Sequence, residues 1–169
     1  MLKIVKSLSD LDIEKLLVLY HEDMILLGQE HFFNHSPFDM IRAAEDSFIT
    51  YLREDFFKQK DSLYAIWNVQ DEYKAALRLQ QYNDGLMLDA LMTATEERRK
   101  GYAINLLSAV QEYLSSMSYG VLYSHIDKRN IASLELHKKC GFRCLRDSAR
   151  YLDGTVTHNS LTMQYLIKK

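Results

Sequence analysis

The spacing of apolar residues changes along this chain of 169 residues, and the change limits the folds open to it. Up to Leu52 apolar residues recur every three or four positions, which predicts amphipathic helices. From Ser62 they alternate with polar residues, which predicts strands. Helical spacing returns after Thr93 and strand-like spacing after Gly120. The pattern therefore predicts an α/β (α+β) fold in a single domain over residues 1–169.

The first part of the chain is predicted to be mostly helical. A short strand over residues 2–6 comes first, followed by one amphipathic helix over residues 11–28, with Ser9 and Asp12 as a capping box. A second helix begins at Ser36-Pro37, because proline costs no hydrogen bond in the first turn of a helix.

Three consecutive strands are predicted next, over Leu63–Trp67, Tyr73–Gln80 and Leu86–Thr93. The sequence Asn83-Asp84-Gly85 is typical of a tight turn, since these residues tolerate a positive φ, so the second and third strands should pair antiparallel. The third strand is almost continuously apolar, which predicts that it is covered on both faces.

A helix is expected to begin near Glu96 or Arg98 and to end at Ser118-Tyr119-Gly120. It lies between two predicted strands, and this order requires a parallel crossover inside an otherwise antiparallel sheet. The remaining predicted elements are a strand over 121–126, a short helix from Asn130 to Cys140-Gly141, and two strands around the turn at Asp153-Gly154.

Composition argues against several kinds of partner. The formal net charge is −2, which leaves no basic excess for binding nucleic acid or an anionic membrane. No run of about 18 apolar residues occurs, as a membrane helix would need, and the N-terminus has no targeting pattern. We therefore expect a cytoplasmic protein with no nucleic-acid or membrane partner.

Metal binding is also not expected. Cys140 and Cys144 are too few for a disulfide scaffold or a zinc site and are predicted to be reduced thiols. His31 and His35 are four residues apart, but they precede a helix start and lack a third ligand.

The stretch from Leu91 to Ala103 carries the clearest chemical signal, because a buried strand passes through a basic turn into a helix. Free N–H groups at a helix start attract phosphate, and Gly101 has no Cβ to keep a ligand from the backbone. Arg98, Arg99 and Lys100 add positive charge. This pattern predicts an anion site, although a merely solvated basic turn would look the same.

Two blocks resemble the GNAT superfamily of N-acetyltransferases. Arg98, Gly101 and Ala103 fill the pattern Gln/Arg-x-x-Gly-x-Gly/Ala of the phosphate loop of that family. The block 130–142 resembles its second marker, an Asn and a small residue ahead of an aromatic residue and a terminal Gly-Phe. The motifs cover residues 86–145, and His137 stands where the family commonly has tyrosine.

The resemblance implies a GNAT-like fold, a mixed and mostly antiparallel sheet flanked by helices, with one parallel strand pair that splays apart. It also implies acetyl-CoA as the co-substrate. The implied cofactor-binding residues are Leu91, Met92 and Thr93 along the pantetheine arm, Arg98, Arg99, Lys100, Gly101, Tyr102 and Ala103 around the pyrophosphate, and Asn130 and Ser133 beside the arm.

The implied reaction is direct attack of a primary amine on the thioester in a ternary complex. Asp89 interrupts an apolar strand, and burial would raise the pKa of its carboxyl, making it a candidate base. His137 is the candidate proton donor to the leaving thiolate. Alternatively, Asp89 points outward or is held by a backbone donor, and His137 is simply packed.

The acceptor is less defined by the sequence. Acidic residues crowd the early helices, so a small cationic metabolite or antibiotic is the expected acceptor. Two alternatives remain open, an acetyltransferase of protein amines and a CoA-binding sensor with little turnover, the latter because His137 replaces tyrosine. The last strand, Ser160 to Ile167, could be an exposed edge that pairs with a second copy or could belong to the core of a monomer.

Overall fold

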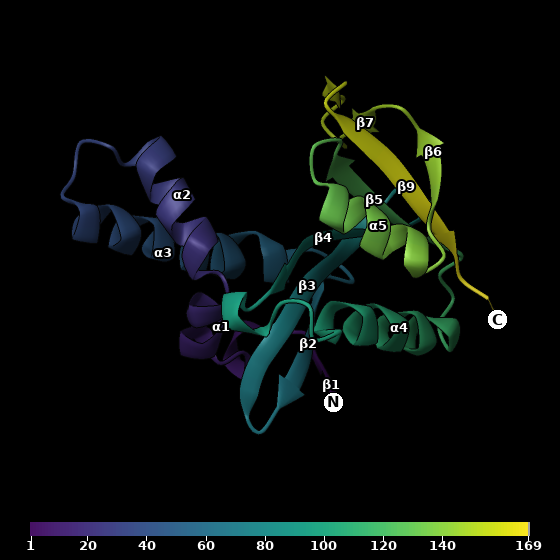
Figure 1. Ribbon diagram of the computed structural model, residues 1–169, viewed down its shortest axis with the longest axis horizontal. Coiled ribbons are helices and arrows are strands. Elements are labelled where there is room, and N and C mark those ends of the chain that lie inside the picture. Colours follow the sequence, from purple (N-terminus) through teal and green to yellow (C-terminus); the bar gives the residue numbers. More distant parts are fainter. Residues whose placement is uncertain (169) are drawn as a thin grey trace.

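The computed structural model describes residues 1–168 and contains one seven-stranded sheet with helices on both faces (Figure 1). The strand order is β1 (Leu2–Val5), β2 (Leu63–Val69), β3 (Glu72–Tyr82), β4 (Gly85–Thr93), β5 (Val121–Asp127), β9 (Ser160–Leu166) and β6 (Arg143–Arg146). Every neighbouring pair is antiparallel except β4 and β5, which are parallel. The predicted mixed sheet with one parallel pair is therefore confirmed.

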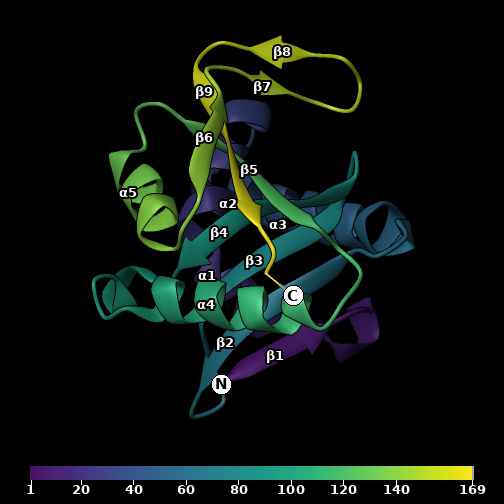
Figure 2. The same ribbon diagram turned by 90° about the vertical axis from the view of Figure 1, so that its right-hand side faces the viewer.

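The helices form two layers, as Figure 2 shows with α4 in front of the sheet and α1, α2 and α3 behind it. Their bounds are α1 Ile13–Leu19, α2 His21–His31, α3 Pro37–Glu54, α4 Tyr102–Ser115 and α5 Ile131–Lys139. Leu106 and Val110 of α4 share a buried cluster with Leu134 of α5, so these two helices cover the same face. Leu16 of α1 and Ala44 of α3 belong to the cluster on the opposite face.

The predicted single helix over residues 11–28 is wrong, because two helices meet at Tyr20. Tyr20 has φ −96° and ψ 14°, which ends α1 and starts α2. Ser9 takes no part in the cap. The Asp12 carboxylate caps α1 by accepting a hydrogen bond from the Lys15 N–H at 3.2 Å, and a 3-10 turn over Leu8–Asp10 precedes it. At this break the Tyr20 side chain is 2% exposed and belongs to the core between the helices and the sheet.

Gly28 does not end a helix as predicted but lies within α2. A Cβ at this position would come within 2.8 Å of the carbonyl oxygen of Met40, so the missing side chain lets α2 and α3 approach closely. The pair of helices extends away from the sheet as an arm (Figure 1).

The third predicted helix begins later than expected. Residues Thr95–Glu97 form a 3-10 turn, Gly101 is the N-cap with φ +84°, and α4 starts at Tyr102. It ends at Ser115 rather than at residues 118–120. The residues between Thr95 and Gly101 therefore form a loop rather than a first helical turn.

The parallel strands β4 and β5 separate along their length. Their pairing covers only Leu86–Leu88 on β4 and Leu122–Ser124 on β5, although both strands continue beyond it. A bulge follows on β4, where the register with β3 shifts and Ala90 has φ +49°. The splayed pair implied by the sequence motifs is therefore present.

The C-terminal part holds four strands rather than the two predicted. Short strands β7 (Ala149–Arg150) and β8 (Val156–Thr157) flank Asp153-Gly154 in a separate hairpin, while β6 and β9 join the main sheet. Of the two alternatives for Ser160–Ile167, the exposed edge is excluded and the place inside the sheet is found, because β9 lies between β5 and β6 and pairs with both. The edge strand beyond β9 is β6, whose four residues are all exposed.

Two findings concern membranes and metals. None of the helices within residues 1–168 combines the length and the apolar composition that a membrane crossing requires. Over the same residues, no three His, Cys, Asp or Glu side chains lie close enough together to hold a metal ion.

Candidate functional site

A groove of about 720 Å³ lies between the start of α4 and the side of α5, and we call it the α4–α5 groove. Its size is within the range of small-molecule sites, roughly 300–1,000 Å³. The loop before α4 and the end of β4 complete it. The lining residues are Thr93, Glu97, Arg98, Arg99, Gly101, Tyr102, Ala103, Ile104, Ile131, Ala132, Glu135, Leu136 and Lys139.

The loop at the start of α4 presents backbone N–H groups to this groove. Arg99 and Gly101 have positive φ angles of 68° and 84°, a sequence of conformations that turns successive N–H groups to one side. The first intrahelical bond joins the Asn105 N–H to the Gly101 carbonyl, so the N–H groups of the first helical turn have no intrahelical acceptor. This geometry suits a phosphate.

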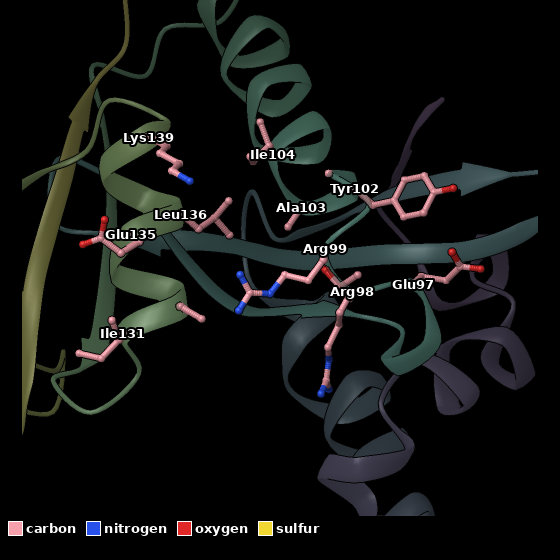
Figure 3. A pocket seen from close by; sticks show the side chains of 13 residues that line it. Glu97, Arg98, Arg99, Tyr102, Ala103, Ile104, Ile131, Glu135, Leu136 and Lys139 are labelled. Atoms are coloured by element: carbon pink, nitrogen blue, oxygen red, sulfur yellow. The ribbon is translucent and has the colours of Figure 1, made fainter.

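The three cations of the loop have different surroundings. Arg98 turns toward α2 and pairs with Glu22, whereas Arg99 extends toward α5 inside the groove (Figure 3). Lys100 pairs with Glu97 at 2.7 Å. Within residues 1–168 Arg99 makes no ion pair, so among the three cations of the loop its guanidinium is the one most available to an anionic ligand.

Six of the predicted cofactor-binding residues line the groove, namely Thr93, Arg98, Arg99, Gly101, Tyr102 and Ala103. The other five, Leu91, Met92, Lys100, Asn130 and Ser133, do not. Leu91 packs against the core on the α4 side and Met92 against the core on the α3 side. Asn130 caps α5, since its Oδ1 accepts a hydrogen bond from the Ser133 N–H at 3.0 Å.

Sequence reasoning missed the wall that α5 contributes. Ile131, Glu135 and Lys139 follow each other at intervals of four residues, and so do Ala132 and Leu136. This spacing places side chains on one face of a helix. The signal was present, but it could not be read as a groove without knowing that α4 lies opposite.

Asp89 is held by two side chains of β3 rather than by a backbone donor. Arg78 Nε donates to Asp89 Oδ1 at 2.9 Å, and Gln80 Nε2 donates to Asp89 Oδ2 at 3.1 Å. The Asp89 side chain is 31% exposed. Burial raises the pKa of this carboxyl above its ordinary value, and the positive charge of Arg78 opposes that rise.

The bulge beside Asp89 is fixed by a residue from the helical layer. The Tyr20 hydroxyl donates a hydrogen bond of 2.5 Å to the carbonyl oxygen of Ala90. The break between α1 and α2 therefore directs the Tyr20 side chain onto the point where β4 leaves its regular register.

His137 lies in the core and does not line the groove. It is 1% exposed, and its ring packs edge-on against Phe142 at 4.9 Å between centroids. Its Nδ1 lies 2.8 Å from the Ser133 carbonyl, which can only accept, so Nδ1 carries a proton. Nε2 is buried without a partner within residues 1–168, and burial lowers the pKa of the ring.

Acidic residues of α2 approach the same end of the sheet from the other face. Glu22 pairs with Arg98, and this hydrogen bond lowers the pKa of its carboxyl. The neighbouring Asp23 has a raised pKa, because it is partly buried and lies beside Glu22.

Comparison with solved structures shows a fold shared over nearly the whole chain. The ribosomal-protein-S18-alanine N-acetyltransferase from Escherichia coli is 20% identical, with 100% of this chain and 96% of that chain covered and a TM-score of 0.62. The PaiA N-acetyltransferase from Thermoplasma acidophilum, in complex with coenzyme A, is 14% identical, with coverage of 98% and 99% and a TM-score of 0.66. Spermidine N-acetyltransferase from Vibrio cholerae, in complex with CoA and spermine, is 14% identical, with coverage of 98% and 95% and a TM-score of 0.61.

Comparison at the level of sequence identifies the family. A search of curated proteins found no significant match. A family model described as Acetyltransferase (GNAT) family matches residues 27–142, more than half of the chain, and its range includes the splayed strands, the loop before α4 and all of α5. This chain therefore belongs to the acetyltransferase (GNAT) family.

Proposed function

We propose that this protein transfers the acetyl group of acetyl-CoA to a primary amine of a small cationic molecule, such as a metabolite or an antibiotic, by direct attack in a ternary complex. The observation that carries the proposal is the α4–α5 groove, where N–H groups with no intrahelical acceptor and the Arg99 guanidinium, unpaired among residues 1–168, face one space. Its position beside the gap between β4 and β5 lets one ligand span both.

The residues at the groove fit the phosphates of acetyl-CoA. A Cβ built on Gly101 meets nothing within 4 Å, so this position opens on free space that a ligand can use. In the proposal, the backbone from Arg98 to Ala103 binds the pyrophosphate, and Leu91, Met92 and Thr93 offer backbone groups to the pantetheine arm. Asn130 and Ser133 lie beside that arm, and the Asn130 Nδ2 is not used in its helix cap.

Asp89 is the proposed base. Bound acetyl-CoA supplies an activated carbonyl, and the amine must lose a proton as it attacks. The Asp89 carboxylate can take that proton, because its raised pKa brings it closer to neutral pH. The backbone N–H near Met92 or Thr93 is the proposed donor to the oxygen that gains charge.

His137 is the proposed proton donor to the departing sulfur, and the atom that would donate is Nε2. This role requires the doubly protonated imidazolium, since in the neutral ring the only proton is on Nδ1, which donates a hydrogen bond to the Ser133 carbonyl. Burial disfavours that charged form and lowers the pKa of the ring.

A cationic acceptor is supported by the acidic side chains of α2, among them the partly buried Asp23. Of the three structural neighbours described above, one is a spermidine N-acetyltransferase and another acts on an alanine of a ribosomal protein. Both cysteines are free thiols, which supports a cytoplasmic reaction.

The experiment is a calorimetric titration with acetyl-CoA and CoA, followed by thiol release across a panel of small amines, amino acids and peptides. We expect binding, and thiol release that depends on a cationic amine. Asp89→Asn should keep acetyl-CoA binding and lower kcat by about a hundredfold.

Other outcomes identify the alternatives. Tight binding without release on any amine would favour a CoA-binding sensor, and release only with peptides would favour an acetyltransferase of protein amines. Absence of binding would contradict the proposal. Unchanged thiol release in His137→Phe would remove His137 from the mechanism.

A further inference from the structure

We propose that Arg78 is a positioning residue that holds the Asp89 carboxylate ionised and fixed in direction at the start of the β4 bulge. The inference rests on the proposed function, in which Asp89 accepts the proton of the amine. Arg78 itself would touch neither substrate nor cofactor in this role.

The two residues face each other directly across the sheet. Arg78 of β3 is the register partner of Asp89 of β4, and the next registered pair is Ala76 with Met92. The ion pair therefore stands at the last regular position before the bulge. A change in this pair would alter both the carboxylate and the strand that carries it.

Each oxygen of the carboxylate receives one donor. Arg78 Nε binds Oδ1 at 2.9 Å and Gln80 Nε2 binds Oδ2 at 3.1 Å, so rotation of the carboxylate would break both bonds. A carboxylate oxygen has two acceptor positions, and each oxygen keeps one of them free. The carboxylate is thus fixed and can still take a proton.

The Arg78 guanidinium is itself held by aromatic rings. It lies 5.2 Å from the ring centre of Tyr51 in α3 and 5.6 Å from that of Phe56, and the side chain is only 16% exposed. A planar guanidinium can stack on aromatic faces while its edge binds a carboxylate, which a lysine ammonium cannot do. This packing commits Arg78 to one orientation.

The charges around Asp89 determine how strongly Arg78 affects the ionisation of its carboxyl. The other titratable groups that face the pair are the phenols of Tyr20, Tyr51 and Tyr64, and Asp23 from α2. Burial raises the pKa of each phenol, so all three are neutral near pH 7. Arg78 is thus the cation that opposes the effect of burial on Asp89.

The expected effect of removing this cation has a definite sign. Without Arg78 the pKa of Asp89 rises further, and the carboxyl stays protonated to higher pH. As the solution is acidified, activity that depends on the ionised carboxylate would then be lost at a higher pH than in the wild-type protein. A one-unit shift corresponds to about 1.36 kcal/mol.

The test compares Arg78→Met, Arg78→Lys and the matched control Arg53→Met, which removes an exposed arginine of α3. Two quantities are measured, the pH profile of kcat/KM and the titration of the Asp89 carboxyl by carbon NMR, assigned with Asp89→Asn. For Arg78→Met we expect both to move upward by at least about one pH unit, with the Kd for acetyl-CoA unchanged. Arg78→Lys should recover part of the shift, and Arg53→Met should move neither quantity.

Several results would overturn the inference. If Arg78→Met lowers thermal stability but leaves the titration pH of Asp89 unchanged, Arg78 stabilises the fold and does not control the charge of Asp89. If the titration moves and the pH profile does not, Asp89 is not the base and has nothing to be positioned for. Should Arg78→Met fail to fold, Arg78→Gln, which removes the charge and keeps a side-chain amide donor, provides the same comparison.

The proposed function can fail separately. If the wild-type protein acetylates no amine, the NMR titration still decides whether Arg78 controls the charge of Asp89. A shift in Arg78→Met would support that control, and no shift would overturn it.

Discussion

At the scale of single residues, Gly101 combines a backbone requirement with an open space. Its φ of +84° lies in the region that residues with a Cβ adopt only at a cost, and its missing side chain faces the α4–α5 groove. Gly154, in the β7–β8 hairpin, has φ +89° and also meets nothing within 4 Å. The two glycines therefore share a conformation and differ in location.

This pair provides a controlled prediction. Valine at either position should destabilise the fold by a similar amount, about 1–2 kcal/mol, because the left-handed strain is the same. Only Gly101→Val should also weaken acetyl-CoA binding, by about a hundredfold, since it keeps the phosphates from the N–H groups of α4. Calorimetry measures the affinity for acetyl-CoA, and thermal melting measures the loss of stability. Equal affinities in the two variants would contradict the proposed phosphate site.

His137 gives a prediction about stability and pH. Burial lowers the pKa of its ring in the folded protein, so the unfolded chain binds the proton more readily. Its contribution to stability is therefore complete above the ordinary pKa of about 6.5. As the pH falls from there through the folded value, that contribution is lost.

The measurement compares the wild-type protein with His137→Phe, which keeps an aromatic ring at the site. As the pH is lowered from 6.5 to 5, we expect the Tm of the wild type to fall more steeply than the Tm of His137→Phe. His125, whose pKa is also lowered by burial, is present in both proteins and cancels in the difference. Parallel curves would show that His137 does not titrate in this range.

At the scale of elements, the α2–α3 arm depends on one close contact. A Cβ at Gly28 would lie 2.8 Å from the Met40 carbonyl oxygen, which is backbone and cannot rotate away. In an exposed helix, Gly→Ala would stabilise by about 1 kcal/mol. Here we expect Gly28→Ala to lower the free energy of unfolding by about 1–3 kcal/mol, because the helices must separate.

Urea denaturation measures this effect, with Gln29→Ala as the control at an exposed position of the same helix. The control should leave stability within about 0.5 kcal/mol of the wild type. A gain in stability for Gly28→Ala would mean that α2 and α3 can separate without loss.

At the scale of the whole molecule, the gap between β4 and β5 sets where a ligand can pair with the sheet. Asp89, Met92 and Thr93 pair with β3 on either side of the bulge, but the pairing with β5 ends at Leu88 and Ser124. Backbone groups that face this gap depend on water or a ligand for hydrogen bonds.

We therefore expect acetyl-CoA to slow hydrogen exchange in residues 89–93 and 98–103, and to leave residues 86–88 unchanged because they are already paired on both sides. Exchange followed by mass spectrometry of short peptides checks this. Protection confined to β6 or to the β7–β8 hairpin would move the ligand away from the splayed strands.

Local sequence was sufficient for much of the fold. Alternation and an apolar run predicted β2, β3 and β4, the Asn83-Asp84-Gly85 turn predicted the antiparallel pairing of β3 with β4, and the strand–helix–strand order predicted the parallel pair. These features depend on neighbours close in the chain, which is why periodicity and turn residues reveal them. The two family motifs predicted the acetyltransferase family for the same reason, since each lies within one short segment.

The tertiary structure alone decided the features that join distant segments. Tyr20, at the break between α1 and α2, donates a hydrogen bond to Ala90, and the partners of Asp89 come from the neighbouring strand. The internal position of β9 depends on β6 pairing beyond it, and the burial of His137 depends on how α5 packs. A local pattern contains no information on such contacts, because they arise only when segments far apart in sequence compete for the same hydrogen bonds and the same core.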